Sequence, residues 1–567
     1  MPTKRQRALG IASSLTSIAK QKNLNKVPLK ASVFLEQISS KPTKNRIKQL
    51  VQLLKTKPQR TVSGVSPLAV MSKYHPCPHG RCTFCPGGEF SRFKSPQSYT
   101  GHEPASMRAF RNDFDAFLQT FDRLHQYILN GHIPQKNEVI VMSGTFLSFP
   151  YNYQYNFIKD IYAACNTFGQ LFYKNKELNY KKFLNFFKIK NPYELDKIKK
   201  QDNASRVKLL KNKILKIKNK RKNLTLKQEQ KINESANIRI IGLTIETKPD
   251  WCRPEHIKQA LSYGCTRIEL GVQNLNDESL KFTNRGHKVI DVITATKNLK
   301  DSALKVCYHI MPGLPGSNPK QDIKMFKTLF QNQDYKPDML KIYPLAIIID
   351  TPIYIQYKRG EIKPYTFDQI VDVISWGYKY IPNYCRVMRI QRDIPSNLIE
   401  GGAKMSNLRQ VVENKIKELK LKVKEIRFRE IGRVKINSEK IKIIYKTTKY
   451  KASGGLEYFI EAIDKKTNAI LGFIRIRIPN KPFLQVLKNS AFVRELHVYG
   501  ESVPVGEKPQ THQLQHKGIG KHLMKLAEKT TKQHKLKKLA VTAGIGVREY
   551  YKKLGYKLKD GFMINKL

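Results

Sequence analysis

Short apolar runs that end in small residues recur along the first two-thirds of the chain. The first is Glu138–Thr145, and helical patterns separate most of the later ones. The later runs are 238–247, 266–272, 305–312, 339–345 and 385–391. Runs of this kind are typical of parallel strands buried on both faces. Six such strands alternating with helices predict an α/β fold built on a partial (β/α)6 barrel, whose ligands gather at the carboxyl ends of the strands.

The loops after these predicted strands carry glycine or polar residues where a ligand would bind. They are 143–145 (Ser-Gly-Thr), 246–250 (Glu-Thr-Lys-Pro-Asp), 271–273 (Gly-Val-Gln) and 311–316 (Met-Pro-Gly-Leu-Pro-Gly). Glycine has no Cβ, so the backbone can lie close to a cofactor. A plain turn is the alternative for any single loop.

A different pattern begins near residue 456. Strand-like runs at 456–463, 469–478 and 491–499 precede the sequence Gln-His-Lys-Gly-Ile-Gly at 515–520, which opens a helix. Its glycines allow the first N–H groups of the helix to close on a pyrophosphate, which the helix dipole also favours. A strand at 538–542 and a helix at 547–554 follow. This order predicts an acetyl-CoA-dependent N-acetyltransferase domain, and a generic phosphate-binding αβ unit is the alternative.

These patterns divide the chain into four parts. We predict a basic helical segment at 1–65, the barrel at 66–395 with a lysine-rich insertion at about 174–231, a linker subdomain at 396–455 and the acetyltransferase domain at 456–567. Within the barrel part, residues 105–130 are predicted to form one helix. Its stripe of Met107, Phe110, Phe114, Phe117 and Phe121 is most simply core.

The charge of the chain points to a polyanionic partner. There are 104 Lys and Arg against 45 Asp and Glu, a net charge of +59. The excess is concentrated: residues 1–60 carry 14 basic residues and one acid, and residues 174–231 carry 20 and five. Both stretches mix lysine with aliphatic residues at helical spacing, which indicates basic amphipathic helices. We rank RNA above a membrane surface as the partner, and we see no apolar run long enough to span a membrane.

Three cysteines, Cys77, Cys82 and Cys85, lie in a loop too short to hold a core. Three thiolates leave one position open on a four-iron cluster, which is what S-adenosylmethionine needs in order to bind iron. A zinc site would add His75 or His79, and inert thiols are the remaining alternative. A disulfide is disfavoured because the eight cysteines are spread along a chain without a signal peptide, which suggests a reducing cytoplasm.

The chain resembles the catalytic subunit family of Elongator, which combines a radical S-adenosylmethionine domain with a GNAT-type acetyltransferase. The similarity runs from about Pro67 to Leu567, interrupted by the lysine-rich insertion. The motifs that carry it are CPHGRCTFCPGG (77–88), SYTGHEPASM (98–107), GLTIETKPD (242–250), YGCTRIELGVQ (263–273), TNRGH (283–287), KIYP (341–344), QRDIP (391–395), RELHVYG (494–500) and REYYKKLGY (548–556). The gap between the first two cysteines is that of prokaryotic members.

The resemblance assigns roles to particular residues. Cys77, Cys82 and Cys85 would hold a 4Fe–4S cluster, and Gly144, Thr145, Glu246 and Gln273 would contact S-adenosylmethionine. Acetyl-CoA would be bound by Lys136, Glu495, Leu496, His497, Val498, Gln515, Gly518, Ile519, Gly520, Lys521 and Tyr551. His497 and Tyr551 would be catalytic, the tyrosine by orienting or protonating the CoA thiolate; a packed ring is its alternative. Ser143 stands where the family usually has glycine.

The implied reaction is the formation of 5-carboxymethyluridine at the wobble uridine, position 34, of tRNA. The single-stranded anticodon loop allows that base to be turned into a pocket. The resemblance leaves open the electron donor and whether the chain forms a homodimer or needs further subunits. The alternatives are a protein lysine acetyltransferase with a structural iron–sulfur cluster and a non-catalytic, basic RNA-binding scaffold.

Overall fold

The structure is a computed structural model that describes residues 64–188, 200–434, 441–499 and 518–567. The predicted basic segment at 1–65 lies outside the described residues except for its last two. Among the described helices, we find none that is both long and apolar enough to cross a bilayer.

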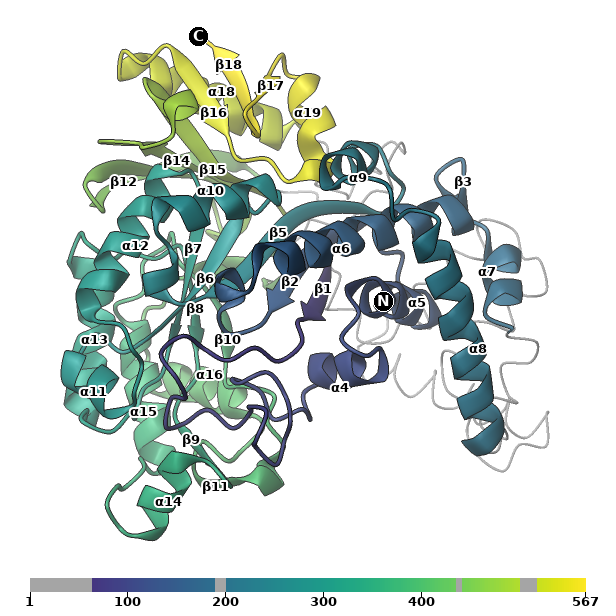
Figure 1. The fold of residues 1–567 in the computed structure, drawn as a ribbon. Helices are drawn as coiled ribbons and strands as arrows, with labels where there is room; N and C mark the ends of the chain where they lie inside the picture. Colours follow the sequence, from purple (N-terminus) through teal and green to yellow (C-terminus); the bar gives the residue numbers. More distant parts are fainter. Residues whose placement is uncertain (1–63, 189–199, 435–440, 500–517) are drawn as a thin grey trace, which may run out of the picture.

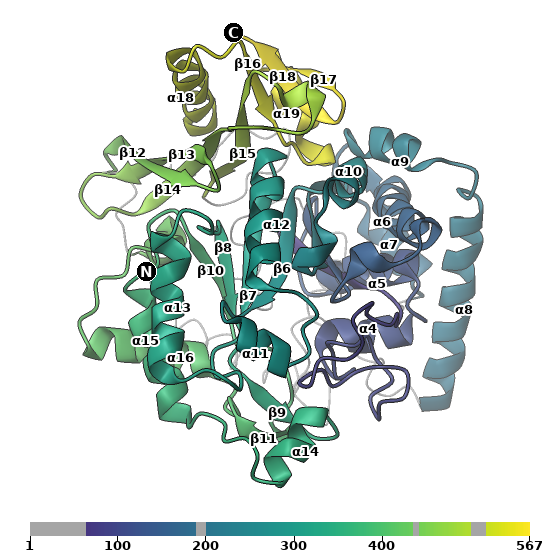
Figure 2. The same cartoon turned by 60° about the vertical axis from the view of Figure 1, so that its left-hand side comes forward.

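The first sheet is a curled half barrel of parallel strands in the order β1-β2-β5-β6-β7-β8-β10 (Figures 1 and 2). The strands are β1 (Ser66–Met71), β2 (Lys136–Met142), β5 (Arg239–Thr247), β6 (Arg267–Gln273), β7 (Lys305–Ile310), β8 (Met339–Ile342) and β10 (Arg386–Ile390). The main helices around it are α5 (Ala116–Leu129), α6 (Tyr151–Phe172), α10 (Pro254–Ser262), α12 (Val289–Asp301), α13 (Pro319–Gln331), α15 (Phe367–Tyr378) and α16 (Leu408–Glu418). The predicted α/β half barrel is therefore confirmed.

The edge strand β1 is one that the apolar pattern did not predict. It pairs in parallel with β2 from Ser66 to Met71. Gly64 and Pro67 give the local sequence the signature of a turn, but proline is compatible with an edge strand, where its missing N–H breaks no ladder. The pairing with β2, not the local sequence, therefore decides the conformation.

The helix predicted over 105–130 is two helices, α4 (Pro104–Arg111) and α5. Asp113 and Phe114 between them have φ of 49° and 56°, the left-handed region that a helix cannot continue through. Phe117 and Phe121 are buried, whereas Met107 and Phe110 are 45% and 40% exposed. The prediction of one helix with a wholly buried stripe was wrong in its first half.

The lysine-rich insertion packs beside α5 and α6 and contains a basic helix, which buries Ile214 but leaves Val207 and Leu209 exposed. Its elements are β3 (Tyr173–Lys174), β4 (Glu177–Leu178), α7 (Tyr180–Phe186), α8 (Lys200–Asn219) and α9 (Leu226–Asn233). Ile214 of α8 is buried in the barrel core, while Lys208, Lys213 and Lys216 are exposed. Smaller elements elsewhere are β9 (Ala346–Ile348), β11 (Ile399–Gly402), α11 (Asp277–Phe282), α14 (Pro352–Lys358) and α17 (Ile426–Arg429).

The second sheet has the order β12-β13-β14-β15-β16-β18-β17 and lies at one end of the barrel (Figure 1). Its strands are β12 (Ile443–Ala452), β13 (Gly455–Asp464), β14 (Ile470–Ile478), β15 (Ser490–Val498), β16 (Lys538–Val541), β17 (Lys557–Lys559) and β18 (Phe562–Lys566), with helices α18 (Ile519–Gln533) and α19 (Arg548–Lys552). The segment 396–455 serves both sheets, because Val412 of α16 joins the barrel core whereas β12 pairs along its whole length with β13.

Candidate functional site

The cysteine loop lies at the carboxyl ends of the barrel strands, opposite the second sheet (Figure 2). Cys82 and Cys85 are 2% and 4% exposed, and Cys77 Sγ lies 3.9 Å from Thr145 Oγ1 in the loop after β2. An apolar layer that includes Phe84, Met311, Leu314 and Leu345 packs with Cys82 and Cys85. The fold thus brings the three predicted ligands together at the end of the barrel where a ligand is expected.

Cys82 is surrounded by hydrogen-bond donors. A hydrogen bond with Cys85, followed by the charge of Arg285 and a bond with His79, holds the pKa of Cys82 well below its ordinary value. Arg285 Nη1 donates to Cys82 Sγ at 3.2 Å, and His79 Nε2 lies 3.1 Å from the same sulfur. A thiolate is the form of cysteine that binds metal, so these contacts fit a ligand sulfur.

The surroundings of the loop fit a bound cluster and cofactor better than a zinc ion. Some buried polar atoms at the carboxyl ends of β5 and β6 have no partner within the described residues, among them Thr247 Oγ1 and Gln273 Oε1. A bound cofactor could supply hydrogen-bond partners for these atoms. His75, one candidate fourth zinc ligand, instead packs on Phe149 with ring centroids 4.4 Å apart.

Only one set of three or more metal-ligating atoms in the described residues lies within 4.8 Å of one another, and it is elsewhere. It consists of Glu269, Cys307 and His309 inside the barrel. Glu269 is already ion-paired with Lys341 and lies 3.4 Å from Arg267 Nη2. Because two cations neutralise this carboxylate, we do not interpret the group as a cation site.

The residues predicted to contact S-adenosylmethionine lie at the carboxyl ends of β2, β5 and β6, and Thr145 contacts the cysteine loop. Gly144 has φ of 85°, and a Cβ there would lie 2.9 Å from Ser98 Oγ, so the turn requires glycine. Glu246 accepts a 2.6 Å hydrogen bond from Tyr99 OH. Gln273 is held at φ of 67°, an unusual conformation that occurs at functional sites. The neighbouring Ser143 shares a 2.9 Å hydroxyl bond with Ser72.

The barrel interior is lined by charged side chains where such barrels usually carry branched apolar layers. From the amino end, Arg267 Nη1 lies 2.5 Å from Glu138 Oε1, and Glu269 contacts His309 at 2.9 Å. Lys341 joins Glu269 to Glu246, its Nζ lying 3.7 Å from Glu246 Oε1. A chain of polar contacts therefore runs from the amino end of the barrel to the cysteine-loop end.

In the second sheet, β15 separates from its neighbour where the resemblance places acetyl-CoA. It pairs with β16 only from Ser490 to Val493 but with β14 as far as Val498. The backbone from Leu496 to Val498 consequently runs past the end of its pairing with β16. Such an edge can hydrogen-bond an extended pantetheine arm.

The separated part of β15 faces the amino end of the barrel. Glu495 Oε1 lies 3.6 Å from Lys305 Nζ at the start of β7, and Lys305 with Arg475 lowers the pKa of Glu495 to about 2 although burial opposes this. Burial lowers the pKa of His497, which favours the neutral imidazole. The Glu495 side chain is thus committed to ion pairs, whereas His497 keeps a neutral ring against Phe473 and Tyr499.

The other predicted acetyl-CoA residues fall into three groups. Gly518, Ile519, Gly520 and Lys521 form the start of α18, with Gly518 at φ of 79°. Lys136 pairs in register with Arg239, beside the loop that follows β16. Gln515 lies outside the described residues. The helix start and Lys136 therefore belong to the end of the barrel that the second sheet occupies.

The two adjacent tyrosines of α19 differ in their surroundings. Tyr551 is 6% exposed and packs in the core of the second sheet, and burial raises its pKa. Tyr550 is 40% exposed, and a Cβ on Gly520 would lie 2.9 Å from its hydroxyl. The structure thus places Tyr550 against the turn predicted to bind pyrophosphate, a contact that the sequence did not indicate.

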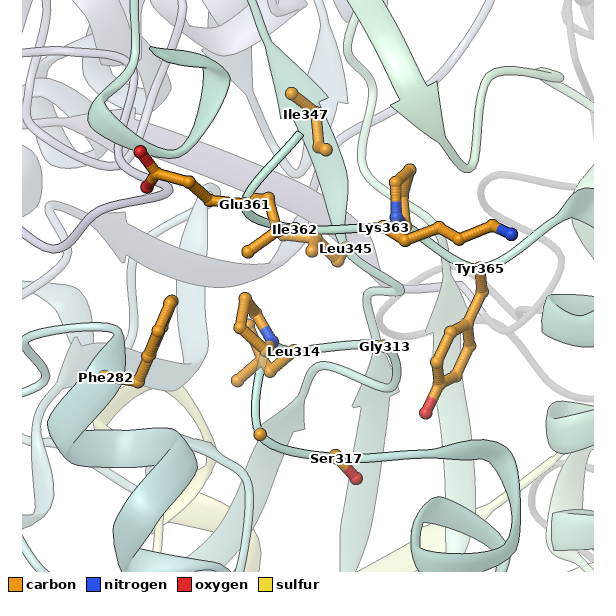
Figure 3. Close-up of a pocket in the computed structure, with 13 residues that line it drawn as sticks. Phe282, Gly313, Leu314, Ser317, Leu345, Ile347, Glu361, Ile362, Lys363 and Tyr365 are labelled. Atoms are coloured by element: carbon orange, nitrogen blue, oxygen red, sulfur yellow. The ribbon is translucent and has the colours of Figure 1, made fainter. Parts of the chain in front are cut away.

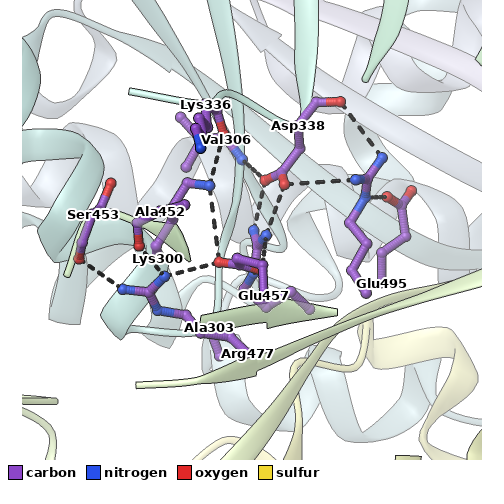
Figure 4. A network of polar contacts seen from close by, with 12 residues as sticks. Lys300, Ala303, Val306, Lys336, Asp338, Ala452, Ser453, Glu457, Arg477 and Glu495 are labelled. Carbon is purple, nitrogen blue, oxygen red and sulfur yellow. Dashed lines mark hydrogen bonds and ion pairs between the residues drawn. The ribbon is translucent and has the colours of Figure 1, made fainter. Parts of the chain in front are cut away.

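A buried ion-pair network joins the second sheet to the barrel (Figure 4). Arg494 of β15 binds Asp338, which precedes β8, through both terminal nitrogens at 2.6 and 2.7 Å. Arg477 of β14 binds Asp301 of α12 at 2.6 Å and Glu457 of β13 at 2.8 Å. All five side chains are at most 1% exposed. Paired, directional contacts of this kind fix the orientation of the two units.

A separate pocket of about 250 Å³ lies beside the loop after β7 (Figure 3). Phe282, Gly313, Ile347 and Tyr365 help to line it. Its Leu314 and Leu345 also belong to the apolar layer that packs with Cys82 and Cys85. The pocket is therefore separated from the cysteines by that layer.

Comparison with known proteins identifies both parts. Residues 204–329 match the radical SAM superfamily, 337–418 the radical SAM C-terminal domain and 511–561 the acetyltransferase (GNAT) domain. The chain is 41% identical to the tRNA uridine(34) acetyltransferase of Methanocaldococcus jannaschii, over 92% of this chain and 88% of that one. It is 35% identical to the human Elongator complex protein 3, over 96% and 93%. The chain belongs to the Elongator complex protein 3 family.

A solved structure agrees with this assignment. The archaeal Elp3 of Methanocaldococcus infernus, with residues 1–46 deleted, superimposes with a TM-score of 0.70 at 36% identity, covering 89% of this chain and all of that one. Radical SAM membership implies a 4Fe–4S cluster and S-adenosylmethionine, and the GNAT domain implies acetyl-CoA. The predicted family, fold class and cofactors are confirmed, and the chain is an acyltransferase enzyme.

Proposed function

We propose that this enzyme forms 5-carboxymethyluridine at the wobble uridine of tRNA from acetyl-CoA, with S-adenosylmethionine as the source of radical chemistry. The names of its relatives support tRNA uridine 34 as the substrate. The carrying observation is that the thioester strand β15 faces one end of the half barrel and the cysteine loop occupies the other, with a charged interior between them.

The bound cluster and S-adenosylmethionine would supply removal of a hydrogen atom from an unactivated methyl group. Cys77, Cys82 and Cys85 would hold the cluster. Thr145 and Gln273 would contact S-adenosylmethionine beside it. The free edge of β15 would hold the pantetheine arm, so that the acetyl methyl group points into the barrel. Neutral His497 on the same strand would accept a proton when water cleaves the thioester.

The surface lysines of α8 would contribute to tRNA binding together with the basic N-terminal segment. Lys211 and Lys218 are tied to acids of the barrel, Asp113 and Asp115. Lys208, Lys213 and Lys216 are exposed. These exposed lysines can neutralise phosphates, and binding should therefore weaken steeply with salt.

Three further points belong to the same proposal. We place the chain in the cytoplasm, because its eight cysteines, three of them assigned to the cluster, form no disulfide. The reaction needs an external electron donor. We keep the division at residues 395 and 455 as part of the proposal, with the intervening segment contributing to both units.

The direct test incubates the anaerobically reconstituted chain with tRNA, reductant, S-adenosylmethionine and acetyl-CoA, and then analyses the digested nucleosides by mass spectrometry. We expect 5-carboxymethyluridine only when all components are present. A transcript with cytidine at the wobble position is the matched control and should remain unmodified. Acetylated protein without modified tRNA would instead support a lysine acetyltransferase.

A further inference from the structure

The segment 283–287 (Thr-Asn-Arg-Gly-His) is shaped around the cysteine loop. The backbone N–H of Thr83 donates to the carbonyl of Thr283 at 3.2 Å, and Asn284 Nδ2 donates to the carbonyl of Arg81 at 2.8 Å. A Cβ on Gly286 would lie 2.3 Å from the Cβ of His79, so only glycine fits there. This segment therefore fixes both the path of the loop and the place of the His79 ring.

Arg285 in the same segment is held so that it points at one sulfur. Its Nη2 donates to the carbonyl of Gly271 at 2.8 Å, and its Nη1 donates to Cys82 Sγ at 3.2 Å. The residue is 6% exposed. A buried guanidinium cannot lose its proton, so it places a permanent positive charge beside Cys82.

A second hydrogen-bond donor to the Cys82 sulfur is His79, which in turn contacts Lys248. Lys248 Nζ lies 2.9 Å from His79 Nδ1, and His79 Nε2 lies 3.1 Å from Cys82 Sγ. Lys248 is 2% exposed, and its ammonium group also lies 3.3 Å from Asp250 Oδ2. An ammonium group can only donate, so Nδ1 accepts and Nε2 carries the proton that is donated to the sulfur.

We propose that Arg285, Lys248 and His79, here called the Cys82 clamp, are positioning residues that raise the reduction potential of the cluster. A reduced cluster carries one more negative charge than an oxidised one. N–H donors and cations at a ligand sulfur therefore stabilise the reduced state more, and burial leaves them little screened. The clamp makes it easier for the donor to deliver the single electron that the reaction needs, and no bond at the clamp changes in that step.

The test measures the midpoint potential of the reconstituted full chain by a redox titration followed by electron paramagnetic resonance, without S-adenosylmethionine. Lys248→Met removes the charge and the donor to His79 without touching the sulfur. We expect the equilibrium constant for reducing the cluster of this variant to fall about tenfold. For one electron this is a shift of the midpoint potential by about 59 mV to more negative values. His79→Phe should shift the potential in the same direction.

Two control variants separate this role from loop stability. Arg81→Met removes a guanidinium that bonds to the carbonyls of Cys85 and Pro86, and not to a sulfur, so it should shift the potential clearly less than Lys248→Met does. Lys248→Arg keeps the charge and should load iron with a potential close to that of the unchanged chain. Failure of Lys248→Arg to load iron would overturn the proposal.

Iron and sulfide contents accompany each titration. Lys248→Met and His79→Phe chains that are fully loaded with unchanged potentials would also overturn the inference. The inference rests on the proposed function only through the cluster. If the unchanged chain binds no cluster, both the proposed function and this inference are wrong. If the cluster is loaded but its potential does not depend on the Cys82 clamp, only this inference is wrong.

Discussion

Tyr550 and Tyr551 are adjacent, yet the structure predicts different effects of removing their hydroxyl groups. If Tyr551 protonates or orients the CoA thiolate, Tyr551→Phe should lower the rate of tRNA carboxymethylation by about 100-fold, the usual scale for a general acid. Tyr550→Phe is the matched control and should change mainly the affinity for acetyl-CoA, because its hydroxyl lies at the turn of Gly520. Steady-state assays that vary acetyl-CoA distinguish the two, and an unimpaired Tyr551→Phe chain would show that Tyr551 is only a packed ring.

Glu425 gives a prediction for stability against pH. Burial raises its pKa from an ordinary 4.5 to about 7, although the N–H groups of Arg427 and Val387 bond to its Oε2. When folding raises the pKa of a carboxyl group, ionisation of that group destabilises the folded state. For Glu425 this destabilisation is absent below pH 4.5 and complete above pH 7. This pKa shift corresponds to a decrease of at most about 3 kcal/mol in the free energy of unfolding.

Glu425→Gln keeps the acceptor and removes the charge. Thermal denaturation should therefore show a more stable variant at pH 8 and no difference at about pH 4. A variant that is equally stabilised at both pH values would exclude an ionisation effect.

The hydrophobic pattern predicted most elements well where strands are buried on both faces, as in β5 and β6. It missed β12, whose lysine, threonine and tyrosine side chains are largely exposed at the edge of the second sheet. The cysteine loop could be recognised from the spacing of its three cysteines. The contact of Lys248 with His79 could not, because 169 residues separate them and only the barrel closure brings them together.

The loop after β16 packs closely against the barrel strand β5 because Gly544 has no side chain. A Cβ on Gly544 would lie 2.0 Å from the carbonyl oxygen of Ile241 in β5, so the loop can approach the barrel only with glycine. Gly544→Ala should lower the melting temperature and the yield of 5-carboxymethyluridine. Gly242→Ala, where the Cβ would meet Glu138 Cγ at an ordinary 3.5 Å, is the control and should be tolerated. Equal stability of both variants would contradict the close docking.

The buried ion-pair network between the two sheets should keep radical formation coupled to transfer of the carboxymethyl group to the uridine. Asp338→Asn keeps the shape of the residue but leaves Arg494 and Arg475 short of a counter-charge. The loss of one partner of a buried pair typically costs about 3–5 kcal/mol. Because β15 carries both Arg494 and the segment proposed to hold the thioester, we also expect more 5′-deoxyadenosine to be released for each carboxymethyluridine formed.

The matched control is Asp393→Asn, whose partner Arg389 lies on the surface. The Asp393 side chain is 54% exposed, and such pairs contribute about 0–1 kcal/mol. Calorimetry and product ratios measure both variants. If Asp338→Asn lowers stability without changing the ratio of the two products, the network is structural and does not govern alignment.

We propose that the barrel makes the methyl carbon of the acetyl group reactive toward the uridine. Acetyl-CoA that carries heavy carbon in the methyl group only tests this proposal. The label should appear in the carboxymethyl carbon bonded to carbon 5 of the wobble uridine, with formation of 5′-deoxyadenosine. Label found only in free acetate or in acetylated lysine, with unlabelled uridine, would contradict it.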